Sequence, residues 1–175
     1  MNPRSGKRAR ITDDAIAVFA EKGFHQARVS DIARRAGVAD GTIYLYFKNK
    51  EDLLLSIFEE SMDIMLRGLR SALDGSEDPL EGIRRFAYYH LSQVKDHRAL
   101  AEVLQVELRL SNKFLKDYRP EKLWEYLEVF SELIRRGQLS GQIRTDVEPY
   151  IASWAFFGSL YELAMQWVLT RDKAR

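Results

Sequence analysis

Residues 27–46 read ARVSDIARRAGVADGTIYLY and predict a pair of short helices joined by a tight turn. Ser30 and the acid after it are typical of a helix start, and Gly37 predicts the end of that helix after two turns. Asp40 predicts the start of the second helix. Two helices of this length around a glycine turn have the spacing of a helix-turn-helix, although helix pairs that only build a core have it too.

The second of these helices, predicted over 41–47, carries unusual groups on its outward side. An ordinary solvent-exposed helix would carry Glu and Lys, whereas this one has hydroxyls and a cation: Thr42, Tyr44, Tyr46 and Lys48. Hydroxyls and phenols can hydrogen-bond phosphate oxygens or base edges from within a major groove. Lys50, at the start of the next helix, would add a cation for a phosphate. This chemistry predicts a DNA-binding helix.

Charge is unevenly divided along the chain. Residues 1–50 hold ten Lys and Arg against five Asp and Glu, whereas residues 51–175 hold seventeen against twenty-one. A small basic segment of this kind suits a polyanionic partner, although a solvated basic face has the same composition. The acidic remainder is expected to do something else.

Helical periodicity runs through the whole chain without sustained strict alternation, so we predict an all-α fold. Caps are predicted at Asn49, Asp78 and Asp146, and helix ends at Gly23 and Gly137. With these signals, further helices are predicted over 11–22, 50–73, 80–95, 98–110, 120–136 and 147–170. The stripe of apolar residues in the second of these indicates one long helix that leaves the N-terminal domain.

Composition excludes several classes of protein. With 175 residues, 46% of them hydrophobic, the chain can bury a core, and without cysteine it has no disulfide framework. The uncharged run at 149–160 is far shorter than the roughly 20 residues of a membrane span, and the polar start of the chain does not resemble a secretory leader. We therefore expect a soluble cytoplasmic protein without a membrane partner.

The chain lacks the residue patterns of an enzyme. Its three histidines, His25, His90 and His97, form no H-E-x-x-H, and there is no G-x-S-x-G, no glycine-rich phosphate loop and no cysteine nucleophile. No catalytic residue, no metal ligand and no cofactor is therefore predicted.

The stretch VSDIARRAGVADGTIYLYFKNKEDLL closely resembles the DNA-binding domain of the TetR family of bacterial repressors, above all in G-V-x-x-G-x-x-Y-x-Y-F-x-x-K-x-x-L. The resemblance implies a three-helix DNA-binding domain over 1–50, with the helix-turn-helix at about 27–46. It also implies a long connecting helix into a larger helical domain, 51–175, that dimerises and binds a small ligand. The expected partners are a palindromic double-stranded DNA operator and a second copy of the chain.

The resemblance also assigns residues to the DNA. Bases would be faced by Thr42 and Leu45. The phosphate backbone would be met by Tyr44, Tyr46, Lys48 and Lys50, with Ser30 and Gly41 at the same surface. An arm beside the duplex would be formed by Arg4, Lys7, Arg8 and Arg10.

Within the family, the segment ELRLSN at 107–112, together with VADGTIYLYFKNKEDLL, resembles the subgroup that represses fatty-acid degradation genes and responds to long-chain acyl-CoA. The implied effector is long-chain acyl-CoA, which would release the repressor from its operator. Family members usually carry one more helix after the position of Arg175. Either this chain is cut short or the helix at 147–170 carries more of the dimer interface.

Two groups of side chains are candidates for the ligand. Apolar and aromatic candidates are Phe86, Tyr89, Leu104, Leu108, Trp124, Phe157 and Tyr161, for which an ordinary core is the alternative. Cationic candidates for a phosphate-bearing headgroup are Arg109, Lys113 and Arg119, in a basic set with Arg98, Lys116 and Lys122, for which solvated salt bridges are the alternative. Arg109 is predicted to grip the headgroup.

The alternative function is a TetR-type sensor of multiple drugs or other small molecules. Such a sensor binds flat cations with aromatic and acidic side chains, here Glu107, Glu125 or Glu162. The basic set near Arg109 argues against it.

Overall fold

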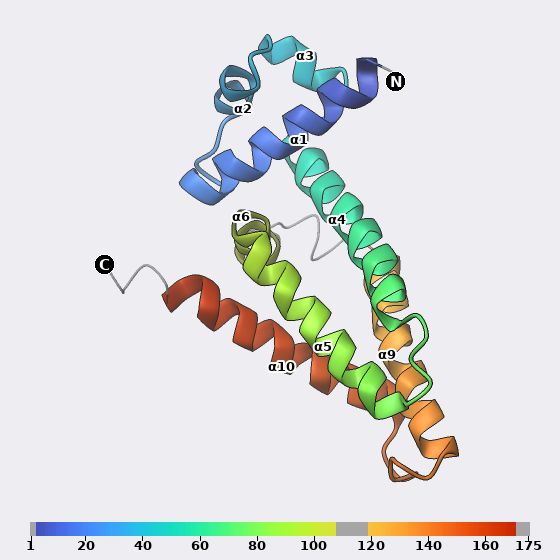
Figure 1. The fold of residues 1–175 in the computed structure, drawn as a ribbon. Helices are drawn as coiled ribbons and strands as arrows, with labels where there is room; N and C mark the ends of the chain where they lie inside the picture. Colours follow the sequence, from blue (N-terminus) through green and yellow to red (C-terminus); the bar gives the residue numbers. More distant parts are fainter. Residues whose placement is uncertain (1–2, 108–118, 171–175) are drawn as a thin grey trace. The chain divides into compact units, whose positions relative to one another are not determined.

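The computed structural model describes residues 3–107 and 119–170, all of whose regular elements are helical (Figure 1). The described residues contain no strand, so the predicted all-α fold is confirmed. No helix in the described part of the chain is both long and apolar enough to cross a membrane.

The helices fall into two packed units. In the first, the described residues up to Glu60 pack with α6 (Arg98–Glu102) and the π-helical η1 (Val103–Glu107), both of which contact α1. The second comprises Ser61–His97 and the described residues from Arg119 onward. The domain boundary at 50/51 stays a prediction, and the long helix α4 (Lys50–Leu73) belongs to both units.

The first unit is built around α1 (Pro3–Lys22), α2 (Val29–Ala36) and α3 (Asp40–Tyr44). Apolar side chains at helical spacing converge from these helices and from the start of α4. The largest that are fully buried here are Phe19, Phe47, Ile11, Ile32, Ile43, Leu53, Leu54 and Ile57. Removing these side chains from water stabilises the small domain and fixes the position of α3.

Both predicted glycine stops in this unit are confirmed. Gly23 has a φ of 75° and its N–H donates to the Phe19 carbonyl, and Gly37 has a φ of 62°, so each adopts the left-handed conformation that ends a helix. The predicted start at Ser30 is wrong by two residues. Arg28 is the N-cap, and its N–H donates to the Asp31 carboxylate at 3.1 Å.

Helix α3 is shorter than the predicted 41–47. It begins at Asp40, with Ala39 as its N-cap, and ends at Tyr44. The N–H groups of Leu45 and Tyr46 bond to carbonyls three residues back instead of four. The chain therefore tightens into a turn here.

The start of α4 confirms the predicted cap at Asn49. The Asn49 Oδ1 accepts from the Asp52 N–H at 2.8 Å, and the Asp52 carboxylate accepts from the Lys48 N–H at 2.9 Å. The returning bond thus goes one residue further back than in a standard capping box.

The second unit contains α5 (Pro79–Asp96), α9 (Glu121–Leu139) and α10 (Pro149–Thr170), each of which packs against the other two. The predicted cap of α5 is confirmed, because the Asp78 carboxylate accepts from the N–H groups of Leu80 and Glu81. The helix predicted over 98–110 is divided between α6 and η1, and residues 108–110 lie outside the described residues.

Two predicted boundaries in this unit are wrong. Helix α9 runs through Gly137 to Leu139, and the left-handed glycine is Gly141, with a φ of 76°. Helix α10 starts at Pro149, where the Glu148 carboxylate accepts from the Ile151 N–H at 2.7 Å. Asp146 does not cap it and instead pairs with Arg144.

Candidate DNA-binding surface and ligand core

The outward side of α3 and of the turn after it gathers the predicted DNA-contacting residues. Leu45 is 82% exposed and Tyr44 is 55% exposed, while Ile43 and Phe47 point into the core. Gly41 and Lys48 are exposed, whereas Thr42 and Tyr46 are half-buried. An apolar side chain as open as Leu45 gains nothing within its own domain but suits contact with a thymine methyl group.

Ser30 lies apart from this helix, in the first turn of α2, and is half-buried. The first turn of a helix presents N–H groups that can hold a phosphate. The predicted phosphate contact of Ser30 stays a prediction.

Lys50 makes contacts within its own domain that the sequence did not predict. Its Nζ donates to the carbonyls of Phe24 at 2.6 Å, Ala27 at 2.9 Å and His25 at 3.3 Å, and it lies 4.5 Å from the centre of the Phe24 ring. Burial lowers the pKa of this ammonium. The three bonds tie the start of α4 to the connection between α1 and α2, and phosphate contact by Lys50 stays a prediction.

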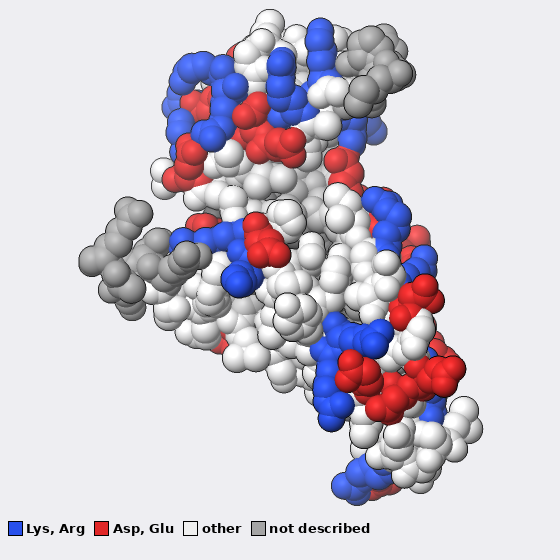
Figure 2. All heavy atoms as spheres, viewed as in Figure 1, with Lys and Arg blue, Asp and Glu red and all other residues white. Residues whose placement is uncertain are grey.

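Four basic residues of the first unit, Arg8, Lys22, Arg34 and Arg35, are paired with carboxylates, and basic and acidic side chains are mixed over this part of the surface in Figure 2. Arg35 pairs with Asp14 and Glu21, and Asp31 pairs with Lys22 at 3.0 Å and with Arg34. The hydrogen bond from Lys22 and then that from the Arg28 N–H lower the pKa of Asp31. Such pairs hold α1 against α2 and compensate cations that would otherwise attract phosphate.

The predicted N-terminal arm is helical from Pro3, because α1 begins there. Arg8 pairs with Glu60 and stacks over the Phe47 ring, so it faces the domain's own core. Lys48, in contrast, is exposed and forms no ion pair within the described residues. It is therefore the clearest candidate for a phosphate contact.

The core of the second unit is a continuous aromatic cluster. Phe86 on α5 contacts Tyr126 at 4.9 Å and Phe130 at 5.3 Å between ring centroids, and Phe130 stacks on Phe156 at 4.1 Å. Phe157 extends the cluster from Tyr126. The predicted ligand residues Phe86 and Phe157 thus meet in one apolar core, which is also the ordinary role of such side chains.

One polar pair lies inside this cluster and was not among the predicted site residues. The His90 Nδ1 is 2.7 Å from the Tyr126 hydroxyl, and both side chains are buried. Burial lowers the pKa of His90 to about 4, so the ring is neutral near pH 7. Its four-residue spacing from Phe86 could have placed His90 on the buried face of α5 from the sequence.

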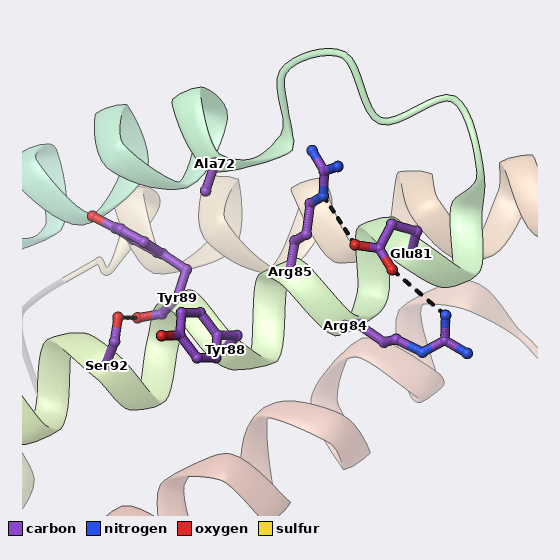
Figure 3. Close-up of a pocket in the computed structure, with 7 residues that line it drawn as sticks. All are labelled: Ala72, Glu81, Arg84, Arg85, Tyr88, Tyr89 and Ser92. Carbon is purple, nitrogen blue, oxygen red and sulfur yellow. Dashed lines mark hydrogen bonds and ion pairs between the residues drawn. The ribbon is translucent and has the colours of Figure 1, made fainter.

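Tyr89 lies between α5 and α4, in an open groove of about 430 Å³ (Figure 3). A methyl group on Gly68 would come within 1.9 Å of the Tyr89 hydroxyl, so the glycine is what lets this ring lie against α4. Arg84 and Arg85 line the same groove, and both pair with Glu81. Tyr89 therefore packs α5 against α4.

The remaining predicted ligand residues are scattered or lie outside the described residues. Trp124 is 48% exposed, Tyr161 is half-buried against Phe157, and Leu104 is half-buried in η1 of the first unit. Arg119 is exposed. Outside the described residues lie Leu108, Arg109 and Lys113.

In the second unit, charged residues proposed for an acyl-CoA headgroup or for a flat cation interact with other side chains of the protein. Lys122, from the basic set, pairs with Asp63 at 2.6 Å. Glu125 pairs with Arg70, and Glu162 accepts from the Gln166 amide on the exposed side of α10. Neither of these carboxylates belongs to the aromatic cluster, as a binding site for flat cations would require.

Comparisons with known proteins match this architecture along almost the whole chain. Residues 11–57 match the family model "Bacterial regulatory proteins, tetR family", and residues 58–174 match "YsiA-like protein, C-terminal region". The fatty acid metabolism regulator protein of Bacillus subtilis (strain 168) is 38% identical over 173 residues, which are 99% of this chain and 89% of the relative.

Solved structures of fatty acid regulators are similar to this chain as well. The transcriptional regulator FadR from Bacillus subtilis, in complex with stearoyl-CoA, superposes with a TM-score of 0.87 at 38% identity, over 95% of this chain and 89% of that one. The fatty acid degradation regulator FadR from Bacillus halodurans also gives a TM-score of 0.87 at 38% identity, over 100% and 89%. The chain belongs to the TetR family of bacterial regulatory proteins.

Proposed function

We propose that the protein is a dimeric TetR-type repressor that binds a palindromic operator of fatty-acid degradation genes and is released from it by long-chain acyl-CoA. The observation that carries the proposal is the match, over nearly the whole chain, to a fatty acid metabolism regulator whose structure was solved with stearoyl-CoA. A repressor works on the chromosome, so we place the protein in the cytoplasm.

The surface of α3 supports the DNA-binding half of the proposal. Tyr44, Leu45 and Lys48 project from one small helix and the turn after it, while Ile43 and Phe47 anchor that helix in the core. A helix-turn-helix places such a helix in the major groove, and a dimer places two of them one helical turn of DNA apart, about 34 Å. The two half-sites give useful specificity where one would not.

The aromatic core of the second unit supports the ligand half. An acyl tail of ten methylenes contributes roughly 8 kcal/mol when it is buried, before ordering costs, so the tail would set the affinity. A phosphate-bearing headgroup needs cations, for which Arg109 and Lys113 remain the candidates.

Helix α4 provides the connection between the two functions. It is one continuous helix of 24 residues, whose first part belongs to the DNA-binding unit and whose second part belongs to the unit with the aromatic core. A ligand that displaces its second part moves its first part, and with it the spacing of the two recognition helices. The coupling is reciprocal, so operator DNA weakens ligand binding by the same factor.

The experiment starts from an operator selected with the protein from a random duplex library. Stearoyl-CoA is then titrated into the protein-operator complex, followed by fluorescence anisotropy, with coenzyme A and stearate as controls. We expect stearoyl-CoA to lower operator affinity and each control to leave it nearly unchanged. Tight binding of stearoyl-CoA without any effect on the operator would mean that acyl-CoA is not the effector.

A further inference from the structure

His90 is a polar side chain in the aromatic core of the second unit, and only one of its ring nitrogens is used there. The side chain is 7% exposed, and Nδ1 is hydrogen-bonded with the Tyr126 hydroxyl at 2.7 Å. Nε2 is buried and has no hydrogen-bond partner among the described residues. A buried polar atom without a partner lowers stability, so its presence calls for a physical reason.

The proton of the neutral ring can be assigned to Nε2. Burial raises the pKa of Tyr126, so its phenol keeps its proton. If the Tyr126 hydroxyl donates to Nδ1, the ring proton lies on Nε2 and one group is left without a partner. The opposite tautomer would leave two, the Tyr126 hydroxyl proton and the Nε2 lone pair. The first arrangement is therefore favoured, and it makes Nε2–H a donor.

The His90 ring lies close to the accessible side of the core. It contacts Phe157 edge-on, at 6.3 Å between ring centroids. Phe157 is half-buried and in turn contacts Trp154, which is 37% exposed. A ligand chain that displaces Phe157 would thus reach His90 without crossing the rest of the cluster.

We propose that His90 is the polar contact for the ligand within the second unit, where its Nε2–H donates to the thioester carbonyl oxygen of a long-chain acyl-CoA. This inference rests on the proposed function. Between its methyl end and its sulfur, a saturated acyl-CoA has one strong hydrogen-bond acceptor, the carbonyl oxygen. It is thus the atom of the apolar half of the ligand that can satisfy the buried donor.

The test compares stearoyl-CoA with S-octadecyl-CoA, a thioether that lacks the carbonyl oxygen, by calorimetry on the full chain. We expect the native protein to bind stearoyl-CoA about tenfold more tightly, because the thioether leaves the buried donor unpaired. His90→Asn keeps an amide near the Nδ1 position for Tyr126 but has no group at Nε2, so the affinity ratio should fall to about one. His90→Gln keeps a donor near Nε2 and should retain most of the ratio.

Ser92→Ala is the matched control on α5, because this hydroxyl is bonded to the Tyr89 carbonyl and should leave the ratio unchanged. Melting temperatures show whether each variant is folded. If one variant is unfolded, the ratio of the native protein's affinities for stearoyl-CoA and S-octadecyl-CoA still tests the proposal. Equal affinities of the native protein for both ligands, or an unchanged ratio in His90→Asn, would overturn the role of His90 while the acyl-CoA function stands. If stearoyl-CoA does not bind at all, both proposals fail.

Discussion

Lys50 donates to three backbone carbonyls of its own domain, while Lys48, two residues earlier, projects into solvent without an ion pair in the described part of the chain. Two lysines that look alike in the sequence thus have different surroundings. The ammonium of Lys50 must leave its carbonyl partners before it can reach a phosphate, whereas that of Lys48 need not.

Replacement of each lysine by methionine separates these roles. Lys50→Met should lower the free energy of unfolding by about 1.5 kcal/mol, since hydrogen bonds to a charged group are lost from a partly buried site. Lys48→Met should leave the melting temperature unchanged and weaken binding to all duplexes alike. Urea unfolding and anisotropy measure both effects. A Lys50→Met protein with native stability but impaired DNA binding would restore Lys50 as a direct phosphate ligand.

The buried His90 makes stability depend on pH. Its folded pKa of about 4 lies below the usual 6.5, so the unfolded chain binds a proton that the folded chain does not between these values. Above pH 6.5, protonation of His90 therefore has no effect on the free energy of unfolding. As the pH falls towards 4, the free energy of unfolding should decrease by about 3 kcal/mol in total.

Urea unfolding of His90→Asn between pH 4 and pH 7 checks this dependence, which should become shallower than in the native protein. His25→Asn, at an exposed position, is the control. A pH dependence that is identical in the native protein and in His90→Asn would show that His90 does not cause it.

At the scale of the helices, packing decides where an element ends. Gly137 was predicted as a stop because glycine follows many helices, yet α9 continues through it. An added Cβ there would lie 2.5 Å from the Ile143 Cδ1. The glycine is thus required by the close approach of the chain that follows α9 and not by its own conformation.

Gly137→Ala should therefore destabilise the protein by about 1 to 2 kcal/mol, because overpacking outweighs the gain of roughly 1 kcal/mol in helix propensity. Leu139→Ala, in the same turn and 90% exposed, should change stability by less than about 0.5 kcal/mol. Thermal unfolding compares the two. A more stable Gly137→Ala protein would show that Ile143 repacks without cost.

At the scale of the whole molecule, α10 has more apolar surface than one chain can cover. Ile151, Leu163 and Leu169 are each more than half exposed. At roughly 100° per residue, Ile151 and Leu169 fall on one line along the helix, and Leu163 lies about 120° round from it. TetR regulators bind operator DNA as dimers, and an exposed apolar helix face of this size is typical of a surface that a second copy covers.

Leu163→Glu should place a charge in this interface and convert the dimer to a monomer in sedimentation. Specific operator affinity should fall with it, because a monomer contacts only one half-site. Leu139→Glu, at an exposed leucine at the end of α9, should leave the dimer intact. A dimeric Leu163→Glu protein would exclude this side of α10 from the interface.

Salt dependence measures the DNA contact of the assembled dimer. With about four phosphate contacts per subunit, the logarithm of operator affinity should fall with that of salt concentration with a slope of roughly −7. Lys48→Ala removes one contact from each subunit and should change the slope to about −5. An affinity that does not depend on salt would contradict phosphate binding altogether.

The sequence by itself determined the all-α fold and the helix-turn-helix, together with the glycine stops at Gly23 and Gly37. Those features depend on local periodicity, caps and backbone conformation, which neighbouring residues set. The outward positions of Tyr44 and Lys48 follow from the same periodicity, whereas that of Leu45 was implied by the family resemblance, which rests on the same short segment.

Only the tertiary structure decided how side chains from distant segments meet. It brought His90 to Tyr126, placed the Lys50 ammonium on the carbonyls of the α1–α2 connection, and required a glycine at position 137 beside Ile143. These contacts join residues that are 6 to 36 positions apart. A buried donor without a partner, or a position with no space for a Cβ, is a property of the packed core, which no local pattern encodes.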